Sequence, residues 1–263
     1  MGKVKISKVV MIGAGNLASH LAPAIKNAGF DLVQVYSRTE LSASRLGNLL
    51  GCSFTSLKSE IRKDGDIYIF ALADDAVEGF FDGSSLSGRI VVHTSGSLDM
   101  GLLAGLSGTF GVLYPVQTFS KEREVDFKQI PVCIEASDET TKQVLFDFAG
   151  KLSSKLYFLN TVQRRKLHVA AVFACNFVNH LYTVSSEILG SEDLPFDLIH
   201  PLIRETANKI NDLPPYVAQT GPAARNDQLT IKKHLDLLSF FPQYKRIYEL
   251  MTEDIISSGK KNR

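Results

Sequence analysis

A glycine-rich segment near the start of the chain has the spacing of a dinucleotide-binding loop. It reads Gly13-Ala14-Gly15-Asn16-Leu17-Ala18, a G-x-G-x-x-A pattern that follows a β-like run and opens a helical one. The first glycine permits the tight turn, the second lets the backbone approach a pyrophosphate, and Ala18 lets helix and strand pack closely. The unpaired N–H groups at the helix N-terminus favour an anion. We predict cofactor contacts from Gly13, Ala14, Gly15, Asn16 and Leu17; the alternative is a glycine turn that binds nothing.

Residues after the next β-like run indicate which dinucleotide binds. An NAD-binding protein carries Asp or Glu here, because a carboxylate binds the ribose 2′-OH. This chain has Ser37-Arg38-Thr39 instead, and Asp31 lies at the other end of the run. A guanidinium is planar, bidentate and permanently charged, which suits a 2′-phosphate. We predict that Ser37, Arg38 and Thr39 bind NADP; the alternative is a solvated arginine at the start of a loop.

The elements that must hold these residues alternate between strand and helix up to about residue 160. Several runs, such as 9–12 and 67–70, are apolar without alternation, as in strands covered on both faces. We expect strands at 8–13, 32–37, 66–72, 89–93, 109–113, 131–136 and 155–159, and helices at 17–27, 161–189, 197–211, 227–239 and 243–256. The predicted fold is therefore α/β: a doubly wound Rossmann-type sheet in residues 1–160, followed by an all-helical second domain in residues 161–263.

Two further segments end at the carboxyl edge of the predicted sheet, where open α/β sheets bind their ligands. Leu72, Ala73 and Asp74 follow one strand, and Thr94 and Ser95 follow the next. We predict cofactor contacts from these five residues, although either segment could be an ordinary turn.

These residues together resemble a known group of proteins. The chain is similar to two-domain NADP-binding proteins that join a Rossmann domain to a helical domain, related to pyrroline-5-carboxylate reductase and the β-hydroxyacid dehydrogenases. More narrowly, it resembles a bacterial branch of NADP oxidoreductases that has no settled reaction. The resemblance covers nearly the whole chain and rests on residues 13–18, 37–38, 72–75, 93–96, 114–119, 168–180 and 220–227. It implies the fold and the cofactor, but not the substrate.

Signatures of the characterised relatives are missing from this chain. β-Hydroxyacid dehydrogenases carry a lysine with an asparagine four residues later, whereas Lys166 is followed at that distance by Ala170. The Ser-Gly-Pro signature of the pyrroline reductases is not found on this helix. Prephenate-type dehydrogenases place His-Pro where this chain has Tyr114-Pro115. None of these three activities can be carried over.

Four polar side chains share one face of the long helix expected at 161–189. At about 100° per residue, His168, Asn176, Asn179 and His180 fall within roughly 120° of one another on an otherwise apolar helix. Polar side chains on such a helix must either hydrogen-bond within the protein or line a hydrated cleft. The alternative to a cleft is a histidine buried in the core, or an asparagine that caps a neighbouring loop. In a cleft, His168 is the candidate general acid, and Asn176 and Asn179 would orient the substrate.

Other candidates lie outside that helix face. His93, at the end of a predicted strand, is the rival proton donor. We predict substrate contacts from His180, Arg225 and Asp227, although Arg225 and Asp227 could instead pair with each other.

Composition limits the partners and the compartment. With 29 Lys+Arg against 28 Asp+Glu, the net charge of +1 favours neither nucleic acid nor an anionic membrane. No stretch approaches 18 uninterrupted apolar residues, and the run at 9–12 is too short for a signal peptide. The three widely spaced cysteines indicate free thiols in a reducing compartment. We predict a cytoplasmic protein without a metal site, a nucleic-acid partner or a membrane partner.

The leading functional hypothesis is an NADP-dependent oxidoreductase that transfers hydride between NADPH and a small C=O or C=N substrate. The alternative is a non-catalytic NADP-binding sensor or assembly protein. Because the long helix is apolar around most of its circumference, we also predict a homodimer formed through the helical domain.

Overall fold

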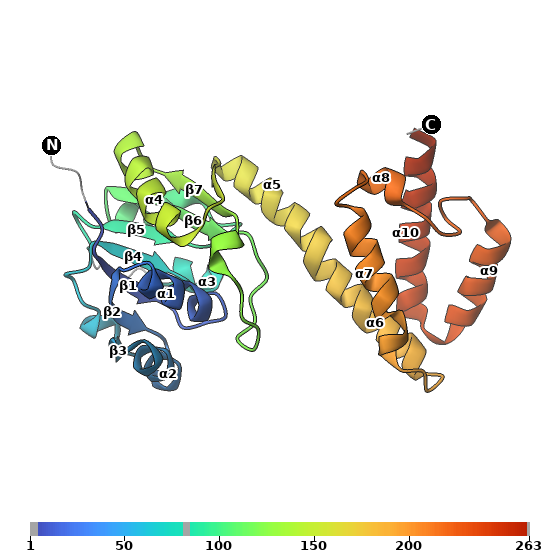
Figure 1. The fold of residues 1–263 in the computed structure, drawn as a ribbon, viewed down its shortest axis with the longest axis horizontal. Coiled ribbons are helices and arrows are strands. Elements are labelled where there is room, and N and C mark those ends of the chain that lie inside the picture. Colours follow the sequence, from blue (N-terminus) through green and yellow to red (C-terminus); the bar gives the residue numbers. More distant parts are fainter. Residues whose placement is uncertain (1–4, 81–84, 262–263) are drawn as a thin grey trace. The chain divides into compact units, whose positions relative to one another are not determined.

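In the part of the chain that the structure describes, eight strands form one sheet in the order β3-β2-β1-β4-β5-β6-β7-β8 (Figure 1). They are β1 Lys8–Ile12, β2 Asp31–Tyr36, β3 Ser53–Thr55, β4 Ile67–Phe70, β5 Ile90–His93, β6 Thr109–Pro115, β7 Val132–Ala136 and β8 Leu156–Phe158. Neighbouring strands run parallel except β6 and β7, which are antiparallel. The order reverses between β1 and β4, which makes this the doubly wound, Rossmann-type sheet that the sequence predicts.

This computed structural model describes residues 5–80 and 85–261, and the chain divides into two compact units, Met1–Asn176 and Phe177–Arg263. The first unit holds the sheet. The helices are α1 Ala18–Asn27, α2 Glu40–Leu50, α3 Asp74–Glu78, α4 Glu139–Leu152, α5 Thr161–Ala171, α6 Val178–Gly190, α7 His200–Lys209, α8 Pro215–Ala218, α9 Gln228–Leu237 and α10 Pro242–Lys261.

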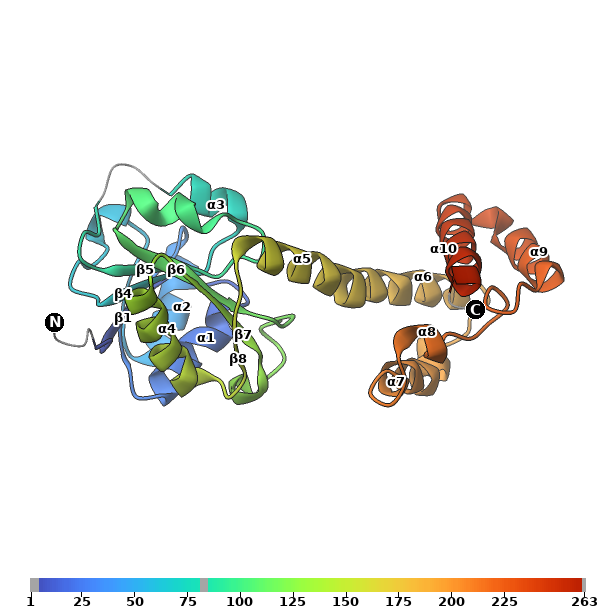
Figure 2. The ribbon, with the colours of Figure 1, turned by 90° about the horizontal axis from the view of Figure 1, so that it is seen from above.

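The central strands β1, β4 and β5 are buried on both faces, which explains their continuous apolar runs. Successive side chains of a strand point to opposite faces. Val9 and Met11 of β1 accordingly pack with residues of α1, α2 and α4, whereas Val10 and Ile12 join a second core on the other face. Figure 2 shows α3 on one side of the sheet and α1 and α4 on the other.

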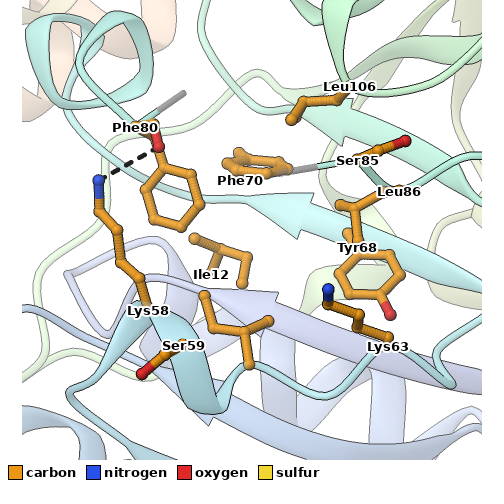
Figure 3. Close-up of a pocket in the computed structure, with 11 residues that line it drawn as sticks. Ile12, Lys58, Ser59, Lys63, Tyr68, Phe70, Phe80, Ser85, Leu86 and Leu106 are labelled. Atoms are coloured by element: carbon orange, nitrogen blue, oxygen red, sulfur yellow. Dashed lines mark hydrogen bonds between the residues drawn. The ribbon is translucent and has the colours of Figure 1, made fainter. Parts of the chain in front are cut away.

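The second face carries only short elements and retains a pocket (Figure 3). Its floor includes the rings of Tyr68, Phe70 and Phe80, and Lys58 and Lys63 also line it. The Lys58 ammonium donates a hydrogen bond to the Phe80 carbonyl at 3.1 Å. None of the described residues that line this pocket is a predicted site residue, so the candidate site must be sought elsewhere.

The long helix begins at Thr161, as expected, because Asn160 caps it. The Asn160 side chain accepts a hydrogen bond from the Gln163 backbone N–H, and the Gln163 side chain accepts one from the Asn160 N–H. A π-helical segment, Val172–Phe177, then separates α5 from α6. The whole helix, Thr161–Gly190, is long and apolar enough to cross a membrane by length and composition, although the sequence analysis expected no such segment.

The second unit contains only helices in its described residues, as predicted. Its small core centres on Val184 of α6, Leu238 after α9 and Tyr244 of α10. The Tyr244 hydroxyl donates a hydrogen bond to the Glu187 carboxylate, and the His234 ring contacts the Tyr248 hydroxyl at 2.8 Å. These contacts tie α6, α9 and α10 together.

Candidate functional site

The glycine-rich loop lies between β1 and α1, beside the point where the strand order reverses. Gly13 has φ +126°, and a Cβ there would collide with the Ala71 carbonyl, so glycine is required. A Cβ on Gly15 would meet no atom within 4 Å, which leaves the backbone open to a ligand. Ala18 is fully buried where α1 packs on the sheet. These features fit a dinucleotide pyrophosphate held at the N-terminus of α1.

Arg38 follows β2 at the same edge of the sheet. Its side chain is exposed, and it takes part in none of the hydrogen bonds or ion pairs among the described residues. Ser37 donates its N–H to the Thr55 carbonyl, and the Thr39 hydroxyl donates to Ser42 at 2.8 Å. The guanidinium is therefore available to a 2′-phosphate, whereas its two neighbours help to shape the loop.

The loops after β4 and β5 are joined by side-chain hydrogen bonds. The Ser97 hydroxyl donates to the Asp74 carboxylate, and the Ser95 hydroxyl accepts from the N–H groups of Ser97 and Leu98. Thr94 is buried and directs its hydroxyl to the Phe70 carbonyl at 3.3 Å. Of the predicted cofactor contacts here, the Asp74, Thr94 and Ser95 side chains thus serve the loops themselves. Ala73 is exposed and Leu72 is partly buried at the edge.

His93 ends β5 and is fully buried. Its Nδ1 accepts a hydrogen bond from the Ser95 N–H at 3.2 Å, so the ring proton sits on Nε2, which has no partner among the described residues. Burial, and then the charge of Arg164, lower the pKa of His93 to about 4, against opposing effects of Asp74 and Asp99. The ring is neutral at neutral pH, which argues against His93 as the proton donor.

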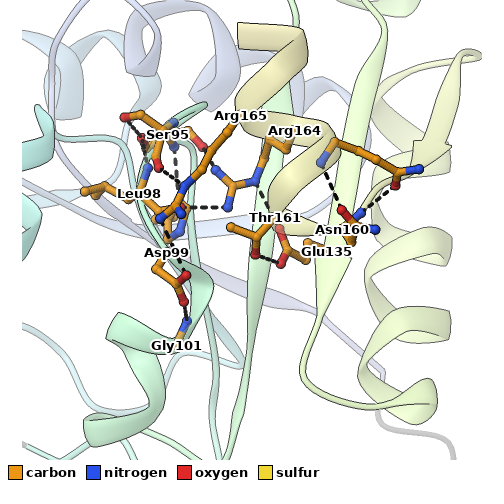
Figure 4. Close-up of polar contacts among 12 residues, drawn as sticks. Ser95, Leu98, Asp99, Gly101, Glu135, Asn160, Thr161, Arg164 and Arg165 are labelled. Atoms are coloured by element: carbon orange, nitrogen blue, oxygen red, sulfur yellow. Dashed lines mark hydrogen bonds and ion pairs between the residues drawn. The ribbon is translucent and has the colours of Figure 1, made fainter. Parts of the chain in front are cut away.

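Arg164 anchors α5 to the sheet, and the sequence analysis did not single it out (Figure 4). Its side chain is 1% exposed, and its Nε lies 3.1 Å from the Glu135 carboxylate of β7. The same guanidinium donates to the carbonyls of Ser95 and Leu98 at 2.9 and 2.7 Å. The Thr161 hydroxyl also donates to Glu135. The first turns of α5 are therefore fixed against both β7 and the loop after β5.

This anchoring brings His168, one turn beyond Arg164, to the edge of the sheet. His168 Nδ1 lies 3.1 Å from the Tyr114 hydroxyl of β6, and the two rings meet edge to face with centroids 6.0 Å apart. The ring also rests on Gly96, where a Cβ would come within 2.5 Å of Nδ1. The structure thus groups His168, Tyr114 and Gly96 at the carboxyl ends of β5 and β6. Tyr114 was noted in the sequence only as part of a motif.

A π-helical segment interrupts the helix on which the polar stripe was predicted. Asn176 lies inside the π-helical segment, where hydrogen bonds run from residue i to i+5, so a uniform 100° step no longer applies beyond it. Asn176 is exposed in the first unit. Asn179 and His180 are exposed on α6, in the second unit. The shared face of all four residues, which was predicted with a uniform 100° step, stays a prediction.

Arg225 and Asp227 lie just before α9, also in the second unit. The Asp227 carboxylate caps that helix, accepting from the Thr230 N–H at 3.1 Å and the Thr230 hydroxyl at 2.8 Å. These hydrogen bonds lower the pKa of Asp227, and the charge of Arg225 adds to the effect. No ion pair joins the two residues in the described part of the chain. Arg225 is exposed.

Comparisons with known proteins agree with the geometry of the glycine-rich edge. A family described as a domain of unknown function (DUF2520) matches residues 130–255. A solved structure named "putative NADP oxidoreductase BF3122", from Bacteroides fragilis, is 43% identical, with a TM-score of 0.88, over 97% of this chain and 99% of that one. No curated protein matches the sequence.

Two more distant structures share the fold. The 1-pyrroline-5-carboxylate reductase of Streptococcus pyogenes is 10% identical, with a TM-score of 0.63, over 95% of this chain and 98% of that one. An imine reductase from Myxococcus stipitatus, solved in complex with NADP+, is 16% identical, with a TM-score of 0.64, over 97% and 93% of the two chains. At these identities the likeness concerns the fold alone.

Proposed function

The chain belongs to the family of two-domain NADP oxidoreductases, and from that premise we propose that it transfers hydride between NADPH and a small C=O or C=N substrate. The cofactor of the family is NADP, and NADPH supplies the hydride when bound. C=N compounds belong among the substrates to be tested, because an imine reductase and a pyrroline-5-carboxylate reductase share the fold.

The placement of His168 carries the proposal. Adding hydride to the carbon of a C=O or C=N group requires a proton on the oxygen or nitrogen. The His168 ring is held at the carboxyl ends of β5 and β6 by Tyr114 and Gly96, on the ligand-binding edge of the sheet. We assign His168 as the proton donor. The Gly13–Leu17 loop and Arg38 hold the phosphates of the cofactor at β1 and β2.

Substrate-dependent oxidation of NADPH by the purified chain tests this function. The panel should contain keto acids, cyclic imines and aldehydes, with NADH as the competing reductant. We expect turnover with at least one carbonyl or imine class, and faster turnover with NADPH than with NADH. NADPH binding without turnover on the whole panel would favour the non-catalytic alternative.

The assembly is proposed to be a homodimer formed through the helical half. Large apolar side chains are exposed there, among them Leu202 at 64%, Leu237 at 74% and Phe240 at 87%. Val169 of α5 is also exposed, at 55%. So much exposed apolar surface favours association. We propose that a second copy of this chain covers it.

We further propose that the protein acts in the cytoplasm. The described cysteines, Cys52, Cys133 and Cys175, are all free thiols, which suits a reducing compartment. The apolar helix Thr161–Gly190 is then assigned to the dimer rather than to a membrane. Support for this comes from Arg164, whose buried guanidinium ties the helix to the sheet.

A further inference from the structure

Among the described residues, Tyr114 is the side chain that forms a hydrogen bond with His168, the candidate proton donor. We propose that Tyr114 is a positioning residue that holds Nδ1 of His168, so that only Nε2 exchanges a proton with the substrate. This inference rests on the proposed function, since it assigns the reactive atom of the same site. Nothing in the comparisons assigns a role to Tyr114.

Both ends of the contact are held by rigid elements. Tyr114 lies within β6, opposite Cys133 of β7 in the antiparallel register. His168 lies four residues after Arg164, which is one helical turn and thus on the same face. Because Arg164 is buried and bonded to Glu135, Ser95 and Leu98, α5 cannot rotate without losing these bonds. The 3.1 Å distance between Tyr114 Oη and His168 Nδ1 is therefore built into the first unit.

Gly96 restricts the ring from another side. A Cβ at this position would lie 2.5 Å from Nδ1, 2.6 Å from Cγ and 2.9 Å from Cβ of His168. Only a glycine lets the imidazole lie against the loop after β5. With Nδ1 held by Tyr114, Nε2 is the remaining polar atom of the ring, and it takes part in none of the hydrogen bonds among the described residues.

The direction of the hydrogen bond follows from the chemistry of a proton donor. In a protonated imidazole both nitrogens are donors, so Nδ1–H donates to the Tyr114 oxygen and Nε2–H is left for the substrate. When Nε2 gives up its proton, the ring becomes neutral with Nδ1 still protonated, and Nε2 regains a proton from solvent. Tyr114 remains a neutral acceptor throughout, because burial raises the pKa of its phenol.

The titratable groups that act on Tyr114 come from three elements. Cys133 of β7, Cys175 of the π-helical segment and Arg164 of α5 act on Tyr114 through their charges. Arg164 is neutralised by Glu135. None of these groups hydrogen-bonds to His168 among the described residues, so Tyr114 is the contact that can select the nitrogen.

Nitrogen NMR of the full chain, labelled at its histidine rings, tests the proposal. In the neutral His168 ring, we expect the proton on Nδ1, which contacts Tyr114, and none on Nε2. The Tyr114→Phe variant removes only the hydroxyl and should abolish this preference. Tyr157→Phe is the matched control, because it removes a hydroxyl that makes no hydrogen bond with the described residues from a tyrosine that is 53% exposed on β8. A neutral ring protonated on Nε2 in the wild type, or an unchanged nitrogen preference in Tyr114→Phe, would overturn the proposal.

Kinetics supply a second readout that separates this inference from the proposed function. Tyr114→Phe should lower kcat about tenfold and leave KM for the substrate unchanged. The NMR measurement needs no turnover. Absence of NADPH turnover by the wild type on the whole panel would contradict the proposed function, and a wild-type kcat in His168→Gln would contradict the assignment of His168 as the proton donor. An unaltered nitrogen preference in Tyr114→Phe would contradict only the role of Tyr114.

Discussion

Arg164 and Glu135 form an ion pair whose side chains are 1% and 9% exposed, with 3.1 Å between Nε and Oε2. It joins α5 to β7, and the same carboxylate also accepts from Thr161. Removing one partner of a buried pair leaves an uncompensated charge. We expect Glu135→Ala to reduce the free energy of unfolding by about 3–5 kcal/mol, measured by urea denaturation.

The exposed pair of Asp99 with Arg165 provides the control. Its side chains are 62% and 48% exposed, and its charged atoms lie 3.5 Å apart. Asp99→Asn removes the charge and keeps a side-chain oxygen that can accept from the Gly101 N–H, so it should cost no more than about 1 kcal/mol. Equal losses of unfolding free energy in the Glu135 and Asp99 variants would show that the buried ion pair of Glu135 with Arg164 does not anchor α5.

Cofactor choice depends on Arg38. A hydrogen bond to a charged group is worth about 1.5–3 kcal/mol, which corresponds to roughly 10–100-fold in affinity. Arg38→Ala should weaken NADPH binding by that factor and leave NADH binding nearly unchanged, as measured by fluorescence titration. Arg246→Ala, at an exposed arginine of α10, should affect neither cofactor. Equal losses for NADPH and NADH in Arg38→Ala would remove the assignment to the 2′-phosphate.

The centre of the sheet could be predicted because β1, β4 and β5 are buried on both faces, which leaves continuous apolar runs in the sequence. β3 was missed because it has only three residues, and Ser53 and Phe54 are exposed. The site was harder to predict. Arg164 lies in a polar run, 163–166, that is typical of an exposed helix face, and its burial depends on Glu135, 29 residues away in the sequence.

The same limit applies to the long helix and to Tyr114. The mostly apolar segment 172–177 has the same sequence pattern whether it is α- or π-helical, so the sequence could not show that it is π-helical. His168 could be proposed from its residue type. Its contact with Tyr114, 54 residues away, needed the pairing of α5 with β6.

Acid sensitivity should follow from His93. Its folded pKa of about 4 lies below the ordinary value of 6.5, so between these values the unfolded chain binds a proton that the folded chain does not. The contribution of neutral His93 to the free energy of unfolding is fully present above pH 6.5. It is lost as the pH is lowered towards 4, by up to about 3 kcal/mol. Urea denaturation of His93→Asn between pH 7 and 4.5 should show a smaller loss than the wild type.

An exposed histidine is the appropriate comparison for that measurement. His180→Asn, on α6, should keep the pH dependence of the wild type. If His93→Asn also keeps it, burial of a neutral His93 does not contribute to acid sensitivity.

The proposed dimer can be tested by light scattering at low micromolar concentration. The exposed apolar residues of the helical half, such as Leu202 and Phe240, predict a particle of twice the chain mass. A monomer at this concentration would count decisively against the dimer and would leave this surface to another partner.

The most direct test of the central claim is the turnover of NADPH by His168→Ala, once a substrate has been found in the panel. General acid catalysis contributes about 10²–10⁴-fold, so kcat should fall by that range while NADPH affinity stays at the wild-type value. His93→Ala, made in parallel, should retain far more activity if its fold is preserved. A near-wild-type kcat in His168→Ala, or a loss confined to His93→Ala, would contradict the assignment of His168 as the proton donor.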